Sequence, residues 1–259
     1  MMRKIIVMAI LCLSCLAPKL PAVVTPTALN ISVQPEHILI GAGYNGKHVS
    51  ITGKIPSEAE SLIRVMSKPE HYKLKQKGRA LGFLWMNLGS VEISKVPGVF
   101  LLYRSGGDPK QTDQQSPQEL DLGLEGLSKQ ADIVANGGDV DTLFDEYVKL
   151  KEKSGLYDVV DNAINYGPNE AGMKTFNALL TLPAALPPGT YDIEVFTIKD
   201  GIINEPVVKK IDAREVGTPA WISNLAYNHG ILYGVLAVLV AVMAGLLTGT
   251  LFKGAKGAH

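Results

Sequence analysis

Residues 186–195 read LPPGTYDIEV, and they mark the start of an alternating strand. Pro187, Pro188 and Gly189 are turn-forming residues, and after them Tyr191 begins an alternation of apolar and polar side chains. Alternation with a period of two places one set of side chains on a buried face and the other in solvent. The stretch therefore predicts a half-buried strand over 191–199, entered through a tight turn.

The same alternation, or an enrichment in β-branched residues, recurs along most of the chain. Further strands are expected at 29–33, 37–41, 48–55, 61–66, 72–77, 82–86, 98–103, 174–182 and 205–215. Short strands at this spacing indicate an antiparallel sandwich, and a Pro-Pro-Gly-Thr-Tyr entry is common in immunoglobulin-like sandwiches, where the tyrosine pins a corner. The predicted fold class is mainly β: one or two antiparallel immunoglobulin-like sandwich modules with an inserted helix, plus one C-terminal transmembrane helix.

The segment from 106 to 135 is rich in Gln, Asp, Ser and Gly, which predicts a loop and a short helix near 118–130. A clearer amphipathic helix is predicted over 141–153, with Asp139 or Asp141 as its N-cap and Gly155 as its stop. The expected organisation is a signal peptide (1–22), an N-terminal β-rich module (23–105), an insertion with a helix (106–171), a C-terminal β-rich part that completes the sandwich (172–219), a juxtamembrane belt (220–228), a transmembrane helix (229–253) and a cytoplasmic tail (254–259).

The N-terminus has the layout of a secretory signal. Arg3 and Lys4 precede an apolar run that is too short to span a bilayer. Cleavage is expected after Ala22, with a cut after Ala28 or an uncleaved anchor as the alternatives. Cys12 and Cys15 are the only cysteines and lie inside this run, so the mature chain would have none, which suits an oxidising compartment.

The C-terminus contains the strongest membrane signal. Gly230 to Phe252 is 23 residues without a charged side chain, about 34 Å as a helix, which is enough to cross the hydrocarbon core. Trp221, Tyr227 and Tyr233 are expected to form an interfacial belt, and Lys253 and Lys256 follow the other end. The chain is therefore predicted to be a single-pass protein of a bacterial inner membrane, with its bulk in the periplasm and its C-terminus in the cytoplasm.

Small residues recur every four positions within this segment, at Ala237, Ala241, Gly245 and Gly249. Such a stripe allows a second helix to approach closely, either from another membrane protein or from a second copy of the chain. The alternative is that Gly and Ala are simply common in membrane helices.

Charge gives few functional clues. The chain has 25 basic and 25 acidic residues, and removal of the predicted signal peptide leaves a formal charge of −3. This small value predicts neither a nucleic-acid nor an acidic-lipid partner. Lys73, Lys75, Lys77 and Arg79 alternate along one expected strand and could attract an oxyanion such as sulfite or sulfate; alternatively, they protect an edge strand from aggregation.

No residue pattern indicates catalysis or a cofactor. The acidic cluster Asp139, Asp141, Asp145 and Glu146 lacks the glycine and the final glutamate of a calcium loop, and acidic residues already suit a first helical turn. The histidines have no recognised metal spacing, so no metal is expected; they are His37, His48, His71, His229 and His259. No G-x-S-x-G nucleophile motif and no complete Walker motif occur in the sequence.

Several separated stretches together resemble a family of transmembrane proteins first described from alphaproteobacteria. They are GFLWMN at 82–87, VPGVF at 96–100, GLY at 155–157, LPPGTYDIEV at 186–195 and the run 229–252. The sequence departs from the family pattern between 106 and 138. The resemblance brings no known catalytic residue, and because members are often encoded beside sulfite-exporter-type permeases, it implies a partner in the membrane.

These observations favour a non-enzymatic, membrane-anchored periplasmic module that is an accessory or interaction subunit of another membrane protein, such as a sulfite-exporter-type permease. The first alternative is a periplasmic receptor domain that binds an anion or a metal. The second is an enzyme of unrecognised type, for which the sequence offers neither a nucleophile nor a base.

Overall fold

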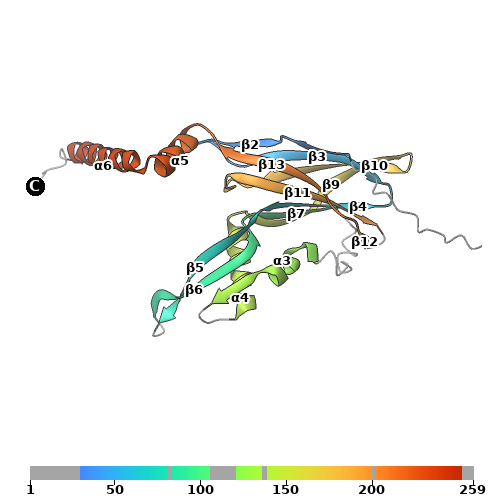
Figure 1. Cartoon of the computed structure of the whole chain (residues 1–259), viewed down its shortest axis with the longest axis horizontal. Coiled ribbons are helices and arrows are strands. Elements are labelled where there is room, and N and C mark those ends of the chain that lie inside the picture. The colour runs from blue at the N-terminus through green and yellow to red at the C-terminus, as the bar shows by residue number, and fades with distance from the viewer. Residues whose placement is uncertain (1–29, 81–82, 106–120, 136–138, 200–201, 253–259) are drawn as a thin grey trace, which may run out of the picture.

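The computed structural model describes residues 30–80, 83–105, 121–135, 139–199 and 202–252. The predicted signal peptide with both cysteines, the turn at 200–201 and the tail that carries the basic residues and His259 lie outside the described residues. Within them, the chain forms a large curled sheet, a layer of helices and a three-stranded sheet on one side of it, and two C-terminal helices that extend away (Figure 1).

The large sheet has ten strands in the described part of the chain. Its order is β1-β3-β10-β9-β7-β4-β11-β13-β2, and the short β12 pairs with β11. Only the β7–β9 and β13–β2 pairs are parallel. The strands are β1 (Ile31–Gln34), β2 (His37–Ile40), β3 (Lys47–Pro56), β4 (Glu60–Ser67), β7 (Phe100–Ser105), β9 (Tyr157–Glu170), β10 (Met173–Leu182), β11 (Gly189–Lys199), β12 (Ile202–Ile203) and β13 (Val207–Glu215).

The two edge strands of this sheet are neighbours in the sequence. β1 and β2 are separated only by Pro35 and Glu36, yet they pair with strands at opposite ends of the order. The sheet must therefore curl until its edges approach each other, and it encloses a hydrophobic cluster that includes Ile63, Phe176 and Ile193, all 0 % exposed. The predicted mainly β class is confirmed. The immunoglobulin-like detail stays a prediction, because the β7–β9 pair joins all the strands into one continuous sheet.

The predicted corner at Tyr191 is present. β11 starts at Gly189, whose φ of +156° suits a residue without a Cβ. Two residues later the buried Tyr191 donates a hydrogen bond from its hydroxyl to the carbonyl oxygen of Pro187. The turn that precedes the strand is thus tied back to the strand's own first buried side chain.

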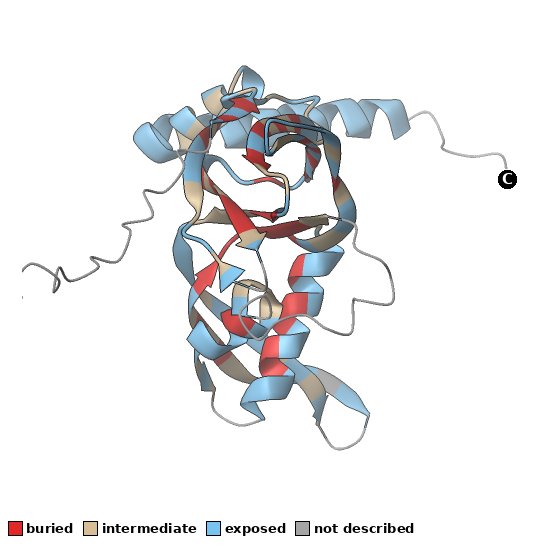
Figure 2. Ribbon diagram, turned by 90° about the vertical axis from the view of Figure 1, so that its right-hand side faces the viewer, coloured by how far each residue is buried: buried red, intermediate tan, exposed pale blue. Residues whose placement is uncertain are grey.

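A second layer covers the outer face of the curled sheet. It consists of a three-stranded sheet in the order β5-β6-β8 and two helices. Their apolar side chains pack against Phe100, Leu102 and Phe196 of the large sheet in a separate cluster; one side of α4 is buried by this contact (Figure 2). The elements are β5 (Pro69–Ala80), β6 (Leu84–Pro97), β8 (Asp132–Ala135), α3 (Leu124–Gln130) and α4 (Val140–Lys153).

The helix expected over 141–153 is confirmed as α4. Its N-cap is Asp139 and not the alternative Asp141, because the Asp139 carboxylate accepts hydrogen bonds from the backbone N–H and the hydroxyl of Thr142. These hydrogen bonds lower the pKa of Asp139 below its usual value. Beyond the C-terminal end, Gly155 adopts a φ of +68°, which fits the predicted stop.

Several strands differ from expectation. β9, a central strand of the large sheet, was expected as part of the helical insertion, because Asn165, Gly167 and Pro168 resemble a loop and its burial alternates poorly. The strands expected at 72–77 and 82–86 are longer as β5 and β6, and they leave the large sheet as a hairpin. The hairpin separates from the β4–β7 pair at Ser67, whose hydroxyl oxygen accepts hydrogen bonds from the backbone N–H groups of Gly98 and Val99.

The C-terminal segment forms two helices, α5 (Thr218–Asn228) and α6 (Gly230–Phe252). Gly217, with a φ of +66°, separates α5 from β13, and His229 interrupts the helical geometry between the two helices. α6 has a mean hydropathy of 2.5 and no part of it is buried against the rest of the chain. It is the one candidate membrane span among the described residues.

Candidate functional site

The predicted helix-packing residues share one stripe of α6. Ala237, Ala241, Gly245 and Gly249 are all exposed. A Cβ added at Gly245 or Gly249 would meet nothing within 4 Å. The stripe therefore has no partner among the described residues of this chain, and side chains larger than glycine would be tolerated by the fold itself.

The predicted belt residues lie on both sides of the break at His229. Trp221 and Tyr227 are on α5, Tyr233 is on the first turn of α6, and all three are exposed. An exposed helix with aromatic side chains, followed at once by an apolar helix, is the arrangement expected at a membrane surface. The segment predicted as a juxtamembrane belt is thus largely helical, a detail that the sequence did not predict.

The predicted anion-binding row follows β5, but its members have different surroundings. Lys73 forms an ion pair with Glu92 on β6, at 2.7 Å between Nζ and Oε1. No carboxylate in the described part of the chain lies within ion-pair distance of Lys75 or Lys77. Arg79 lies close to the end of the strand. The row is therefore not a uniform cationic face, and Lys75 and Lys77 are its best candidates for contact with an anion.

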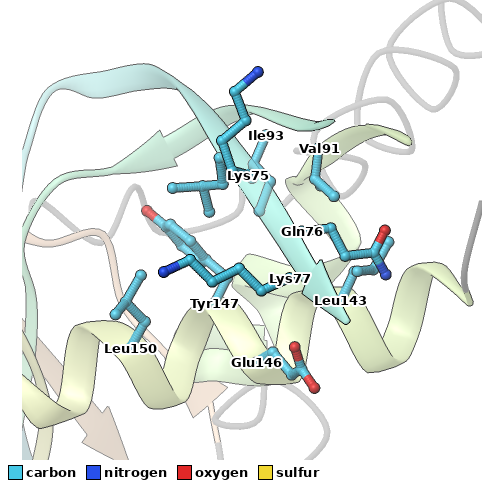
Figure 3. A pocket seen from close by; sticks show the side chains of 10 residues that line it. Lys75, Gln76, Lys77, Val91, Ile93, Leu143, Glu146, Tyr147 and Leu150 are labelled. Atoms are coloured by element: carbon cyan, nitrogen blue, oxygen red, sulfur yellow. The ribbon is translucent and has the colours of Figure 1, made fainter. Parts of the chain in front are cut away.

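Lys75 and Lys77 line an open groove of about 340 Å³ between the hairpin and α4 (Figure 3). Its strand side includes Leu74, Gln76, Val91 and Ile93, and its helix side includes Leu143, Glu146, Tyr147 and Leu150. The floor is thus apolar, and two ammonium groups and one carboxylate lie at the rim. Such a groove could hold an anion only beside an acidic side chain, which weakens its attraction for a free oxyanion.

One helical turn after Tyr147, which lines this groove, α4 carries a buried lysine that the residue pattern did not reveal. Lys151 is 8 % exposed, and its Nζ donates a hydrogen bond to the carbonyl oxygen of Gly98 at 3.1 Å. The same Nζ lies 4.1 Å from the ring centroid of Tyr72, 5.5 Å from that of Tyr147 and 6.0 Å from that of Tyr157. Burial lowers the pKa of Lys151.

The three tyrosines around Lys151 are also held in place. The Tyr157 hydroxyl donates to the carbonyl oxygen of Pro97 at 2.7 Å, and the Tyr72 hydroxyl donates to the Glu70 carboxylate. Burial raises the pKa of Tyr72, Tyr147 and Tyr157. The ammonium group of Lys151 contacts tyrosines of α4, of the base of the hairpin and of β9, and so holds these three elements together. This structural role is sufficient to explain why the lysine is buried. A signal was present in the sequence, since Tyr147 and Lys151 are one helical turn apart on the apolar side of α4.

The acidic cluster at the start of α4 has a structural explanation. Asp139 caps the helix, while Asp141 lies in its first turn, where a carboxylate interacts favourably with the helix dipole. Asp145 and Glu146 follow on the next turn. No group of three or more His, Cys, Asp or Glu side chains suitable for a metal ion occurs among the described residues.

The described part of the chain is thus a β-rich domain that ends in two exposed helices, the second long and apolar enough to span a bilayer. The family model described as "Putative transmembrane protein (Alph_Pro_TM)" matches residues 28–254. The chain belongs to this transmembrane protein family. No curated protein matches the sequence. Family membership and α6 together identify the chain as a membrane protein, with one candidate span among the described residues.

Proposed function

We propose that this member of the Alph_Pro_TM family is a non-enzymatic accessory subunit of another membrane protein, such as a sulfite-exporter-type permease. In this proposal a signal peptide exports the chain, α6 anchors it in a bacterial inner membrane, and the β domain lies in the periplasm. The observation that carries it is the stripe Ala237, Ala241, Gly245 and Gly249 on a fully exposed apolar helix, because a small-residue face lets another helix approach at backbone distance.

The domain itself supports an interaction role. Its charged side chains are distributed among ion pairs such as Arg64–Glu194 and Lys199–Glu58, and the most unusual buried group, Lys151, is explained by the packing of α4. The groove beside Lys75 and Lys77 has no histidine, cysteine, serine or threonine among its lining residues. These features favour binding over bond-making chemistry.

The test is an affinity purification of the full-length protein from native membranes in mild detergent. The variant Gly245→Leu/Gly249→Leu fills the stripe, and Val240→Leu/Thr250→Leu adds bulk on about the opposite face of the same helix. We expect a membrane protein to co-purify with the wild type and the control variant and to be lost with the stripe variant. Recovery of only a differently tagged second copy would identify self-association, and equal recovery of a partner with all three proteins would contradict the role of the stripe.

A periplasmic anion receptor is the second candidate, favoured specifically by Lys75 and Lys77 at the rim of the groove. Titration calorimetry with sulfite and sulfate would test it on the wild type, on Lys75→Gln/Lys77→Gln and on Lys209→Gln, which removes an exposed lysine of β13. Binding that disappears only in the double variant would support the receptor. Absence of heat with the wild type would leave the accessory role as the better explanation.

A further inference from the structure

The far half of the β5–β6 hairpin extends beyond the domain that supports its base. Tyr72, Leu74, Val91 and Ile93 at the base belong to the outer hydrophobic cluster. Past a register shift at Gln76 and Lys77, the two strands continue to pair with each other as far as Ala80 and Leu84. The hairpin therefore projects as a two-stranded arm (Figure 1).

The end of this arm is apolar and exposed. Phe83 is 77 % exposed, Leu84 is 51 % exposed and Met86 is 47 % exposed. In the sequence, no charged residue occurs between Arg79 and Glu92. A cluster of large apolar side chains at the end of a projecting arm is costly to leave in water and indicates a contact with something outside the chain.

The arm is also positively charged behind its tip. Lys73, Lys75, Lys77 and Arg79 lie on β5, and no acidic residue occurs between Glu70 and Glu92. Lys73 is paired with Glu92 at the base, whereas Lys75 and Lys77, nearer the tip, form no ion pair with a carboxylate of the described residues. The net charge of the whole chain conceals this local excess, because acidic residues elsewhere balance it.

The position of the arm suggests what its tip contacts. The hairpin tip and α5 lie at the same end of the long domain, on the left in Figure 1, while the β9–β10 turn lies at the opposite end. α5 leads directly into the membrane-spanning α6. A bilayer that α6 crosses is therefore on the same side of the domain as the tip.

We propose that Phe83, Leu84 and Met86 insert into the interfacial region of the bilayer that α6 crosses, with Lys75 and Lys77 beside the phosphates of anionic lipids. Large apolar side chains next to lysines fit this region, where the former reach the acyl boundary and the latter meet negative headgroups. The domain would then be held to the membrane at two points, and its orientation would be fixed despite the break at His229. This inference does not depend on the partner of α6.

The test uses the full-length chain with Cys12→Ala and Cys15→Ala, reconstituted in nanodiscs. A single cysteine is placed at Asn87, near the tip, or at the matched exposed Asn169, near the β9–β10 turn, and is labelled with an environment-sensitive fluorophore. Nitroxide carried on the lipid acyl chains reports contact with lipid only. We expect a blue-shifted emission and strong quenching for the label at 87, and water-like, unquenched emission for the label at 169.

Variants identify the side chains responsible. Phe83→Ser/Leu84→Ser should abolish the quenching at 87, whereas Leu179→Ser, at an exposed leucine of the sheet, should leave it unchanged. In nanodiscs with anionic lipid, Lys75→Gln/Lys77→Gln should lower the ratio of inserted to free tip by roughly 30-fold. The proposal is overturned if the label at 87 stays water-like, or if it is shielded without quenching by the lipid nitroxide, which would mean that a protein covers the tip.

Discussion

The hydrophobic cluster inside the curled sheet and the cluster between that sheet and α4 differ in the chemistry of their side chains. Every buried member of the inner cluster is aliphatic or aromatic, and several come from strands whose burial alternates regularly, such as β10. The outer cluster surrounds the ammonium group of Lys151 with tyrosines from three separate segments. The inner cluster contains tyrosine hydroxyl contacts, such as that of Tyr103 with the Thr181 carbonyl, but no charged group, whereas the outer one also packs around a buried ammonium group.

The largest effect is expected in the inner cluster. Phe176 is 0 % exposed and packs so closely against Gly53 that a Cβ there would lie 2.6 Å from the ring. Phe176→Ala should lower the free energy of unfolding by about 3–5 kcal/mol, because the cavity lies between strands that cannot collapse inward. Chemical denaturation of the protein in detergent, followed by near-UV circular dichroism, would measure it. A loss below about 1 kcal/mol would mean that the sheet interior is not rigidly packed.

A smaller loss is expected from Lys151 in the outer cluster. Lys151→Ala removes the hydrogen bond to the Gly98 carbonyl and leaves a cavity beneath Tyr72, so we expect a loss of about 2–3 kcal/mol. Lys151→Met keeps most of the side-chain volume and avoids burying a charge, so its cost should be only about 1 kcal/mol. The same denaturation experiment measures both. Equal losses would show that the ammonium group, which both variants lack, rather than packing accounts for the contribution of Lys151.

The sequence predicted the inner cluster much better than the outer one. The alternation around Tyr191 and along β10 follows from local periodicity, and so do α4 with its Asp139 cap and the apolar α6. β9 was missed because only Tyr157 and Ile164 are fully buried along it, and its polar positions resemble those of a loop. A strand with few buried side chains is specified by its neighbours in the sheet and not by its own pattern.

For the candidate sites, too, the sequence predicted local structure but not the contacts between distant segments. The alternation of Lys73, Lys75, Lys77 and Arg79 correctly predicted a strand, but the partner of Lys73 is on β6 and could not be deduced from spacing. The exposed Phe83 and Leu84 were present in the sequence as part of an uncharged run, which was interpreted as a sandwich strand. Whether an apolar hairpin packs inside a domain or projects from it depends on where the chain leaves the sheet, here at Ser67 and Gly98.

The two clusters can also be compared through their titratable groups, because these make the free energy of unfolding depend on pH. Burial raises the pKa of Tyr103 and Tyr191 in the inner cluster and of Tyr147 and Tyr157 in the outer one. A tyrosine whose folded pKa is raised leaves stability unchanged below about pH 10 and reduces it at higher pH, by about 1.4 kcal/mol per pH unit. Buried Lys151 acts in the opposite sense, because its lowered pKa makes stability rise with pH until about pH 10.5.

We therefore expect the unfolding free energy to fall steeply above about pH 10, and Tyr103→Phe to reduce that slope by one tyrosine's contribution. Lys151→Met should remove the opposing contribution, so this variant should lose stability with rising pH more steeply than the wild type just below about pH 10.5. Denaturation at a series of alkaline pH values provides the measurement. A wild-type stability that is flat through this range would contradict the burial of the tyrosines.

The smallest effects are expected when one tyrosine hydroxyl is removed from each cluster. Tyr157→Phe leaves the Pro97 carbonyl without its buried donor, and Tyr191→Phe does the same to the half-buried Pro187 carbonyl. We expect a loss of about 1–2 kcal/mol for Tyr157→Phe and about 0.5–1 kcal/mol for Tyr191→Phe, because water can replace the donor only at the second site. Thermal unfolding of both variants in one detergent would rank them. The reverse order would mean that the corner at Tyr191, rather than the junction around Lys151, is where a single hydroxyl contributes most to stability.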